Sequence, residues 1–241
     1  MTDYAIERPD AARRRGLLGD AAVVLAALAF MLWLPAPQDS VLAYVLSPLR
    51  MLVLCVLAWW LLRRRGETWG GVGWGRPASL RRAVLLVPLG YLLLGLLAAG
   101  LMGLVFPAFD IAPAGSAAAF ASIKGDPLKY AYWLAIAWTS AAIGEELLFR
   151  GFLQSRLEVA FGGGGWALAG ALVVQAAIFG FSHGYQGAGG IMLTSAAGLV
   201  LGAVRLAGRG NLAACVGLHA LVDTISLTAV FLGALPSAGG A

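Results

Sequence analysis

Long apolar runs separated by short polar segments make up most of the chain. A membrane-spanning helix needs about 20 apolar residues, and no segment shows the ten-residue alternation of a β-barrel strand. The pattern predicts an all-α, polytopic transmembrane helix bundle of about seven spans, within a range of about six to eight. The run Ala112–Ile123 is too short to span and predicts a re-entrant or interfacial piece. The expected spans are Leu17–Leu34, Val41–Leu62, Ala83–Phe106, Leu128–Leu153, Trp166–Ser182, Gly190–Leu206 and Leu212–Leu235.

The composition agrees with a membrane protein. Hydrophobic residues make up 60% of the 241 residues and charged residues 12%, whereas a soluble domain carries about 25% charged residues. A soluble chain of this length cannot hide so much apolar surface in one core. These values exclude soluble and disordered classes. The net charge of +5 indicates no nucleic-acid partner, because arginines at the ends of the spans account for it.

The arginines gather at alternate ends of successive spans, which predicts the orientation of the chain by the positive-inside rule. The N-terminus is expected in the cytoplasm and the C-terminus outside. Residues 1–16 are interpreted as a cytoplasmic segment and residues 17–241 as one transmembrane domain. Frequent Ala, Gly and Arg indicate a GC-rich bacterial genome, and therefore a multi-pass protein of the inner (plasma) membrane. Membrane lipids are expected partners, with anionic lipid as a secondary ligand of the arginine clusters.

Several ionisable residues lie inside the apolar runs of the C-terminal half. One such side chain at bilayer depth costs at least about 2.5–3.5 kcal/mol on insertion scales, so an unneeded cluster is improbable. The cluster includes both histidines of the chain and therefore predicts a functional site. Its members are Glu145, Glu146, Arg150, His183, His219 and Asp223.

Spacing along each helix separates the roles of these residues. Glu146 and Arg150 are four positions apart, so they share one helix face and are expected to pair. Glu145 is rotated by about 100° from Glu146 and is left free for chemistry. Asp223, four positions after His219, is expected to orient that ring or stabilise its protonated form.

Spacing between helices predicts that the site residues meet. If Gly162–Gly165 is a helix–helix turn, Glu145 and His183 both lie about 25 Å from it. His219 lies only about 13 Å beyond the next helix–helix turn of the chain. It lies at the same depth as the other two residues if the first hairpin projects about 12 Å farther into the cytoplasm. With that condition, Glu145, His183 and His219 are expected to converge in the cytoplasmic half of the membrane.

Three motifs in order resemble the CPBP family, which includes type II CAAX prenyl endopeptidases and bacteriocin-processing or immunity (Abi) proteins. The resemblance covers about residues 125–235 and implies an all-helical intramembrane protease whose catalytic core lies there. The motifs are Glu145-Glu146-x-x-x-Arg150, Phe179-x-x-x-His183 and His219-x-x-x-Asp223.

The resemblance also implies roles for individual residues. Glu145 and His183 are taken to activate water, and His219 with its partner to bind the oxyanion. Glu146, Arg150 and Phe179 match supporting positions. Relatives often carry Asn where this chain has Asp223, and an ionised carboxylate cannot donate to an oxyanion. Asp223 is therefore expected to orient His219, to bind a metal, or to be held protonated.

The cofactor stays open at this point. The family has been interpreted both as metal-dependent and as glutamate-type without metal. Glu145, His183, His219 and Asp223 are candidate ligands of one divalent metal such as zinc, which would make the chain a metalloprotease. However, HExxH is absent, and Glu145 cannot easily serve as both ligand and base. A metal-free mechanism is therefore favoured.

The predicted function is an intramembrane endopeptidase that hydrolyses a peptide bond in a membrane-anchored or C-terminal-tail substrate. Prenylated peptides, bacteriocin leaders and sorting tails are all compatible with the sequence. One alternative is a non-catalytic immunity or scaffold protein with the same fold. Another is a proton-coupled transporter, because buried Glu and His residues can relay protons, although transporters usually show repeated halves.

Overall fold

The structure is a computed structural model in which residues 10–34, 41–113 and 120–234 are described. These residues form helices and connecting turns, with no strand among them. Six helices are long and apolar enough to cross a membrane, as Ala11–Trp33, Val45–Arg64, Leu80–Ala108, Gly165–Ser182, Gly184–Ala207 and Ala213–Phe231. The predicted all-α transmembrane bundle is confirmed.

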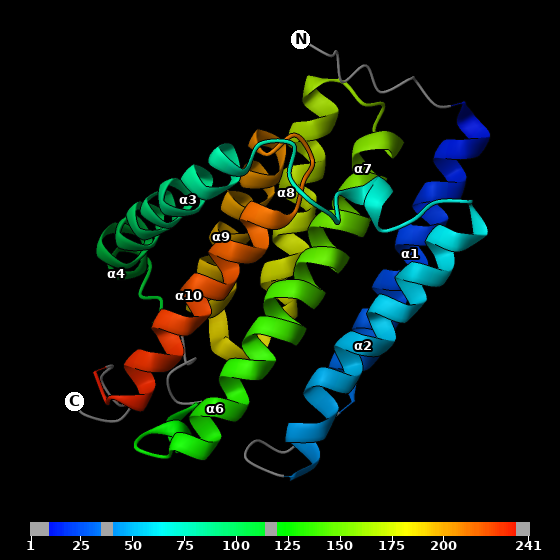
Figure 1. The fold of residues 1–241 in the computed structure, drawn as a ribbon. Helices are drawn as coiled ribbons and strands as arrows, with labels where there is room; N and C mark the ends of the chain where they lie inside the picture. Colours follow the sequence, from blue (N-terminus) through cyan, green and yellow to red (C-terminus); the bar gives the residue numbers. More distant parts are fainter. Residues whose placement is uncertain (1–9, 35–40, 114–119, 235–241) are drawn as a thin grey trace.

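The helices surround one central helical run (Figure 1). This run consists of α6 (Pro127–Ile136), η4 (Ala137–Gln154) and α7 (Ser155–Ala160). The pair α1 (Ala11–Trp33) and α2 (Val41–Arg64) packs on one side of it, and α8 (Gly165–Ser182), α9 (Gly187–Ala207) and α10 (Ala213–Phe231) on the other. The helix α3 (Leu80–Gly100) packs against α9 and α10 and continues through η2 (Leu101–Val105) and α4 (Phe106–Ala108). The short elements η1 (Gly70–Val72), η3 (Ala121–Ile123) and η5 (Gly184–Gln186) lie in the connections.

Capping residues set where three of the helices begin. Asp10 and Ser79 accept hydrogen bonds from the backbone amides of Arg13 and Arg82, at 2.7 and 3.2 Å. Such caps satisfy amides that have no partner inside the helix. Asp126 does the same for α6, whose first residue is a proline. The first helix therefore begins at Ala11, six residues before the expected Leu17.

The fourth expected span, Leu128–Leu153, differs from the prediction in its backbone. Its second half, Ala137–Gln154, forms the wider π-helical hydrogen-bond pattern instead of a regular α-helix. Such segments are rare and occur mostly at functional sites. This segment also carries Glu145, Glu146 and Arg150, so it is not among the six apolar helices. The most polar helix is thus the one at the centre of the bundle.

Two glycine-rich segments behave differently from each other. Gly162 and Gly163 adopt positive φ angles of 108° and 72° in the turn before α8, as expected for a tight helix–helix turn. In the segment around Gly73, the Gly73 carbonyl accepts from the Leu212 amide at 3.0 Å. A side chain at Gly73 would meet the Gly210 carbonyl at 2.0 Å. This loop therefore closes against the turn between α9 and α10.

Two arginine positions that were interpreted as topology anchors are internal. Arg156 and Arg205 are both only 4% exposed. Arg205 donates to Glu158 at 2.7 Å, and Arg156 pairs with Glu67 at 2.7 Å. Arg205 therefore joins α9 to α7, and Arg156 joins α7 to the connection that follows α2.

The expected re-entrant piece at Ala112–Ile123 is described only at its ends, because residues 114–119 lie outside the described residues. At its C-terminal end, Ala121–Ile123 forms one short 3-10 turn with Ile123 fully buried. Ile123 packs with Ala137, Leu227 and Val230. This end of the segment therefore closes the bundle below the central run.

The hairpin of α8 and α9 depends on small residues at its contact. A Cβ at Gly180 would lie 1.9 Å from the Ser195 Oγ and 2.6 Å from the Ile191 carbonyl oxygen. We expect Gly180→Ala to reduce the free energy of unfolding by about 1–3 kcal/mol, because overpacking forces the helices apart. Thermal unfolding in detergent measures this. Gly170→Ala on the same helix is the control, since its nearest neighbour is at 3.4 Å, and equal losses in both variants would contradict the prediction.

Candidate active site

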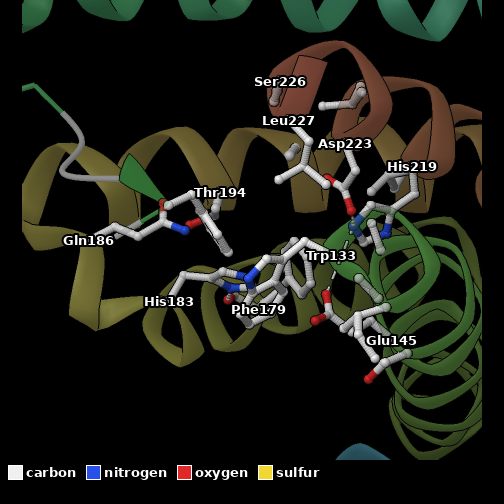
Figure 2. Close-up of a pocket in the computed structure, with 18 of the residues that line it drawn as sticks. Trp133, Glu145, Phe179, His183, Gln186, Thr194, His219, Asp223, Ser226 and Leu227 are labelled. Atoms are coloured by element: carbon white, nitrogen blue, oxygen red, sulfur yellow. Dashed lines mark hydrogen bonds and ion pairs between the residues drawn. The ribbon is translucent and has the colours of Figure 1, made fainter. Parts of the chain in front are cut away.

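A cavity of about 360 Å³ opens between the central run and the last three helices (Figure 2). One part of its wall is polar and carries Glu145, His183, His219 and Asp223. The remaining wall is largely apolar, so the cavity can hold an extended apolar segment beside charged groups. Its apolar lining includes Leu94, Phe120, Trp133, Ile136, Leu201, Leu218, Val222, Leu227 and Val230.

Glu146 is the buried centre of the polar cluster. Its Oε1 atom accepts from the Arg150 Nη1 at 2.8 Å, and both side chains are fully buried. The pairing expected from their four-residue spacing is therefore present. The same oxygen also lies 2.8 Å from the Nδ1 of His219, which is 73 residues away. Glu146 thus joins the central run to α10.

This contact determines which ring nitrogen of His219 faces the cavity. A carboxylate paired with Arg150 is an acceptor, so the Nδ1 of His219 must donate to it. The Nε2 atom then faces the cavity, where it lies 3.6 Å from Asp223 Oδ2 and 4.0 Å from Glu145 Oε2. Glu146 therefore orients the ring. The sequence analysis had assigned this role to Asp223.

Glu145 is the carboxylate left open to the cavity. Its side chain is 18% exposed, against 0% for Glu146. Its Oε2 atom is buried and has no hydrogen-bond partner among the described residues. The structure thus agrees with the expectation that one of the two adjacent carboxylates is held by an arginine while the other stays available.

The close approach of the central run to α2 fixes the position of Glu145 along the bundle. The preceding residue, Gly144, faces α2, where an added Cβ would lie 2.6 Å from the Met51 side chain. The Gly144 carbonyl also accepts a hydrogen bond from the Cys55 thiol at 3.5 Å. Glycine at position 144 therefore allows the central run to pack tightly against α2.

Phe179 lies at the contact between the two histidines and the buried arginine. Its ring centroid is 4.7 Å from that of His183 and 6.2 Å from that of His219. The Arg150 guanidinium carbon lies 4.1 Å from the same ring, which is a cation–π contact. The supporting position implied by the family resemblance therefore packs against three members of the cluster.

His183 ends α8 and lies at the wall of the cavity. Its Nδ1 is 2.8 Å from the Phe179 carbonyl oxygen. A carbonyl can only accept, so this nitrogen carries the proton and the Nε2 of the neutral ring is an acceptor. His183 is therefore suited to accept a proton.

The sequence analysis missed several polar residues on the cavity wall. Tyr185 and Gln186 directly follow the second histidine motif, and Gln186 donates to the Tyr185 hydroxyl at 3.0 Å. Their position next to His183 in the sequence was the signal that could have indicated them. Thr194 also lines the cavity, but no sequence signal separates it from other threonines in apolar helices.

The candidate metal ligands do not form a metal site. Within residues 10–34, 41–113 and 120–234, no group of three or more His, Cys, Asp or Glu side chains is placed to hold an ion. The Nδ1 atoms of both histidines bond to Glu146 and the Phe179 carbonyl, which leaves the two Nε2 atoms without these partners. Among the described residues, Glu145, His183, His219 and Asp223 are therefore not gathered around one point as the ligands of a bound ion would be.

Comparison with known proteins finds a family that is similar to the segment carrying these residues. Residues 127–225 match the family described as type II CAAX prenyl endopeptidase Rce1-like. Over this segment the chain is Rce1-like. The resemblance found in the three motifs is thereby confirmed, and the Rce1-like segment contains Glu145 through Asp223. No curated protein and no solved structure matches the chain.

The family match and the helices together define the class of the protein. The matched family is one of endopeptidases, and six helices among the described residues are long and apolar enough to span a membrane. The chain is therefore a multi-pass membrane protein with a segment similar to a family of endopeptidases. The matched segment covers the central run, α8, α9 and most of α10, whereas α1, α2 and α3 lie outside it.

Proposed function

We propose that the protein is an intramembrane endopeptidase that hydrolyses a peptide bond in a membrane-associated substrate. One observation carries this proposal. In one cavity, Glu145 faces the Nε2 of His219 from a different helix, while Glu146 is held by Arg150. A free carboxylate opposite an oriented imidazole is the pair that water activation and oxyanion binding require.

In the proposed mechanism, Glu145 is the general base. A water molecule between Glu145 and the scissile carbonyl loses a proton to the carboxylate while its oxygen attacks the carbonyl carbon. The π bond of the carbonyl opens, and its electrons form an oxyanion.

His219 supplies the oxyanion site in this proposal. Because Glu146 accepts from Nδ1 and stabilises the imidazolium, the protonated Nε2 can donate to the developing oxyanion. When the intermediate collapses, the carbon–nitrogen bond breaks and the leaving amine takes the proton from Glu145. His183, whose Nε2 is an acceptor, assists in holding the attacking water.

The cavity wall supports a membrane-anchored or C-terminal-tail peptide as substrate. The apolar side chains Phe120, Trp133 and Leu227 give an apolar segment a place to bind, and Tyr185 and Gln186 provide donors for a peptide backbone. By the positive-inside rule, the N-terminus is proposed to lie on the cytoplasmic side of a bacterial inner membrane.

The metal-free form of this mechanism predicts resistance to chelators. Dialysis against EDTA is expected to leave the rate of peptide cleavage within about twofold of the untreated enzyme, because no step passes through a metal. Metal content by mass spectrometry checks that the dialysis is complete. A loss of activity that zinc restores would show that the metalloprotease alternative is correct.

The roles of the two carboxylates around His219 can be separated by amide substitutions. We expect Glu146→Gln to lower kcat/KM about 10-fold or more, because the Glu146 carboxylate orients the His219 ring and stabilises its protonated form. Asp223→Asn is expected to cost less, since the Asp223 oxygen lies 3.6 Å from Nε2 and does not fix the ring. Steady-state kinetics measures both, and a larger loss for Asp223→Asn would refute this assignment.

The proposed function is tested without knowledge of the substrate. Peptide termini in membranes of cells that express the wild type are compared by mass spectrometry with those from cells expressing Glu145→Gln. We expect new termini in membrane-associated proteins only with the wild type. Asp110→Asn, an exposed carboxylate outside the cavity, is the matched control. Identical sets of termini in all three would favour the non-catalytic alternative.

A further inference from the structure

A second cavity, of about 260 Å³, lies between the start of α3 and the turn that joins α9 to α10. It shares no lining residue with the active-site cavity. Its polar lining consists of Ser79, Arg82, Arg209 and Asn211. The proposed protease mechanism uses none of these residues.

The electrostatics of this second cavity favour an anion. Arg82 and Arg209 are exposed, and within the described residues no carboxylate forms an ion pair with either of them. In contrast, Arg65, Arg156 and Arg205 at the same end of the bundle all have acidic partners. The two cavity arginines therefore provide uncompensated positive charge.

Two helices also begin at this cavity. Ser79 caps α3, and Asn211 Oδ1 accepts from the amide of Ala213 at 2.9 Å, at the start of α10. The N-terminal end of a helix carries partial positive charge and favours phosphate groups. The two helix ends add to the charge of the arginines.

An apolar groove continues from the same cavity. It has a volume of about 330 Å³, is also lined by Ser79 and Arg82, and runs along α3 over Leu85, Leu86 and Leu89. Leu85 and Leu89 are 56% and 61% exposed on a helix that is long and apolar enough to span a membrane. A cationic pocket thus leads directly into a leucine-lined groove at bilayer depth.

We propose that this composite site binds an anionic phospholipid. The phosphate lies between Arg82 and Arg209, and an acyl chain follows the groove along Leu85 and Leu89. A free phosphate would use the cationic pocket alone, whereas a lipid uses both parts. The bound lipid connects α3 to the turn that begins α10, the helix that carries His219.

Native mass spectrometry of the purified chain, titrated with phosphatidylglycerol, phosphatidylcholine or inorganic phosphate, tests the proposal. We expect the wild type to bind one phosphatidylglycerol in preference to phosphatidylcholine. The double variant Arg82→Gln/Arg209→Asn is expected to bind it about 25-fold more weakly, from about fivefold for each arginine. Asparagine is chosen because Arg209 has a φ of 59°, which asparagine tolerates.

A second double variant distinguishes a specific lipid site from the general electrostatic attraction of an anionic lipid to the protein. Arg15→Gln/Arg63→Gln removes the same charge from exposed arginines on α1 and α2, away from the cavity. It is expected to keep the affinity of the wild type within about twofold, because surface charges beyond a Debye length are screened. Equal losses in the two double variants, or phosphatidylcholine bound as tightly as phosphatidylglycerol, would overturn the proposal. Inorganic phosphate bound as tightly as the lipid would assign the site to free phosphate instead.

Discussion

Replacing Glu145 by glutamine is expected to lower kcat/KM for a membrane-tethered peptide by about 10²–10⁴-fold, the usual contribution of a general base. The amide keeps the size of the side chain but cannot accept a proton from water. KM is expected to change by less than about threefold, because a general base acts in the transition state and adds little to substrate binding. Initial rates in proteoliposomes, with a peptide identified from the cellular comparison, measure both constants.

The matched control for this substitution is Asp110→Asn. Asp110 is exposed and has a φ of 51°, a conformation that asparagine also adopts without strain. This variant makes the same chemical change outside the cavity and should cleave at the wild-type rate. Cleavage by Glu145→Gln at the rate of Asp110→Asn would remove Glu145 from the mechanism.

Replacing Arg150 by methionine is expected to reduce the free energy of unfolding by about 3–5 kcal/mol. Arg150 is fully buried, and without it the carboxylate of Glu146 is left charged inside the bundle. The cation–π contact with Phe179 is lost as well. Denaturation in mixed detergent micelles, followed by tryptophan fluorescence, measures the change.

A second variant shows that the unpaired charge causes this loss. Glu146→Gln/Arg150→Met removes both charges and is expected to recover most of the stability, since neutral replacement of a buried pair is often tolerated. The control Arg63→Met removes an exposed arginine of α2 and should cost less than about 0.5 kcal/mol. If the double variant is no more stable than Arg150→Met, the explanation from an unpaired carboxylate is wrong.

The fold could be predicted largely from the apolar runs. A span about 20 residues long has few alternatives to a helix in a bilayer, because its backbone groups must bond within the segment. The π-helical course of Ala137–Gln154 could not be predicted, since a shift in hydrogen-bond register leaves no mark in the apolar pattern. The burial of Arg156 and Arg205 was also missed, because their acidic partners come from other segments.

The candidate site shows the same division between local and distant contacts. The pairing of Glu146 with Arg150 follows from helix geometry alone. The second contact of Glu146, with His219, joins residues 73 positions apart and depends on how α10 packs against the central run. Sequence spacing therefore assigned the orientation of His219 to its neighbour Asp223, whereas the structure gives it to a more distant carboxylate.

The central claim, that Glu145 as base and His219 as oxyanion donor act together in one hydrolytic step, is tested most directly by combining two substitutions. The measurement is kcat/KM for Glu145→Gln, His219→Gln and the double variant on one tethered peptide. Groups that act as a unit are not additive, so we predict that the double variant loses no more activity than the more damaging single variant. Losses that multiply in the double variant would show that the two residues act independently and would contradict their joint action.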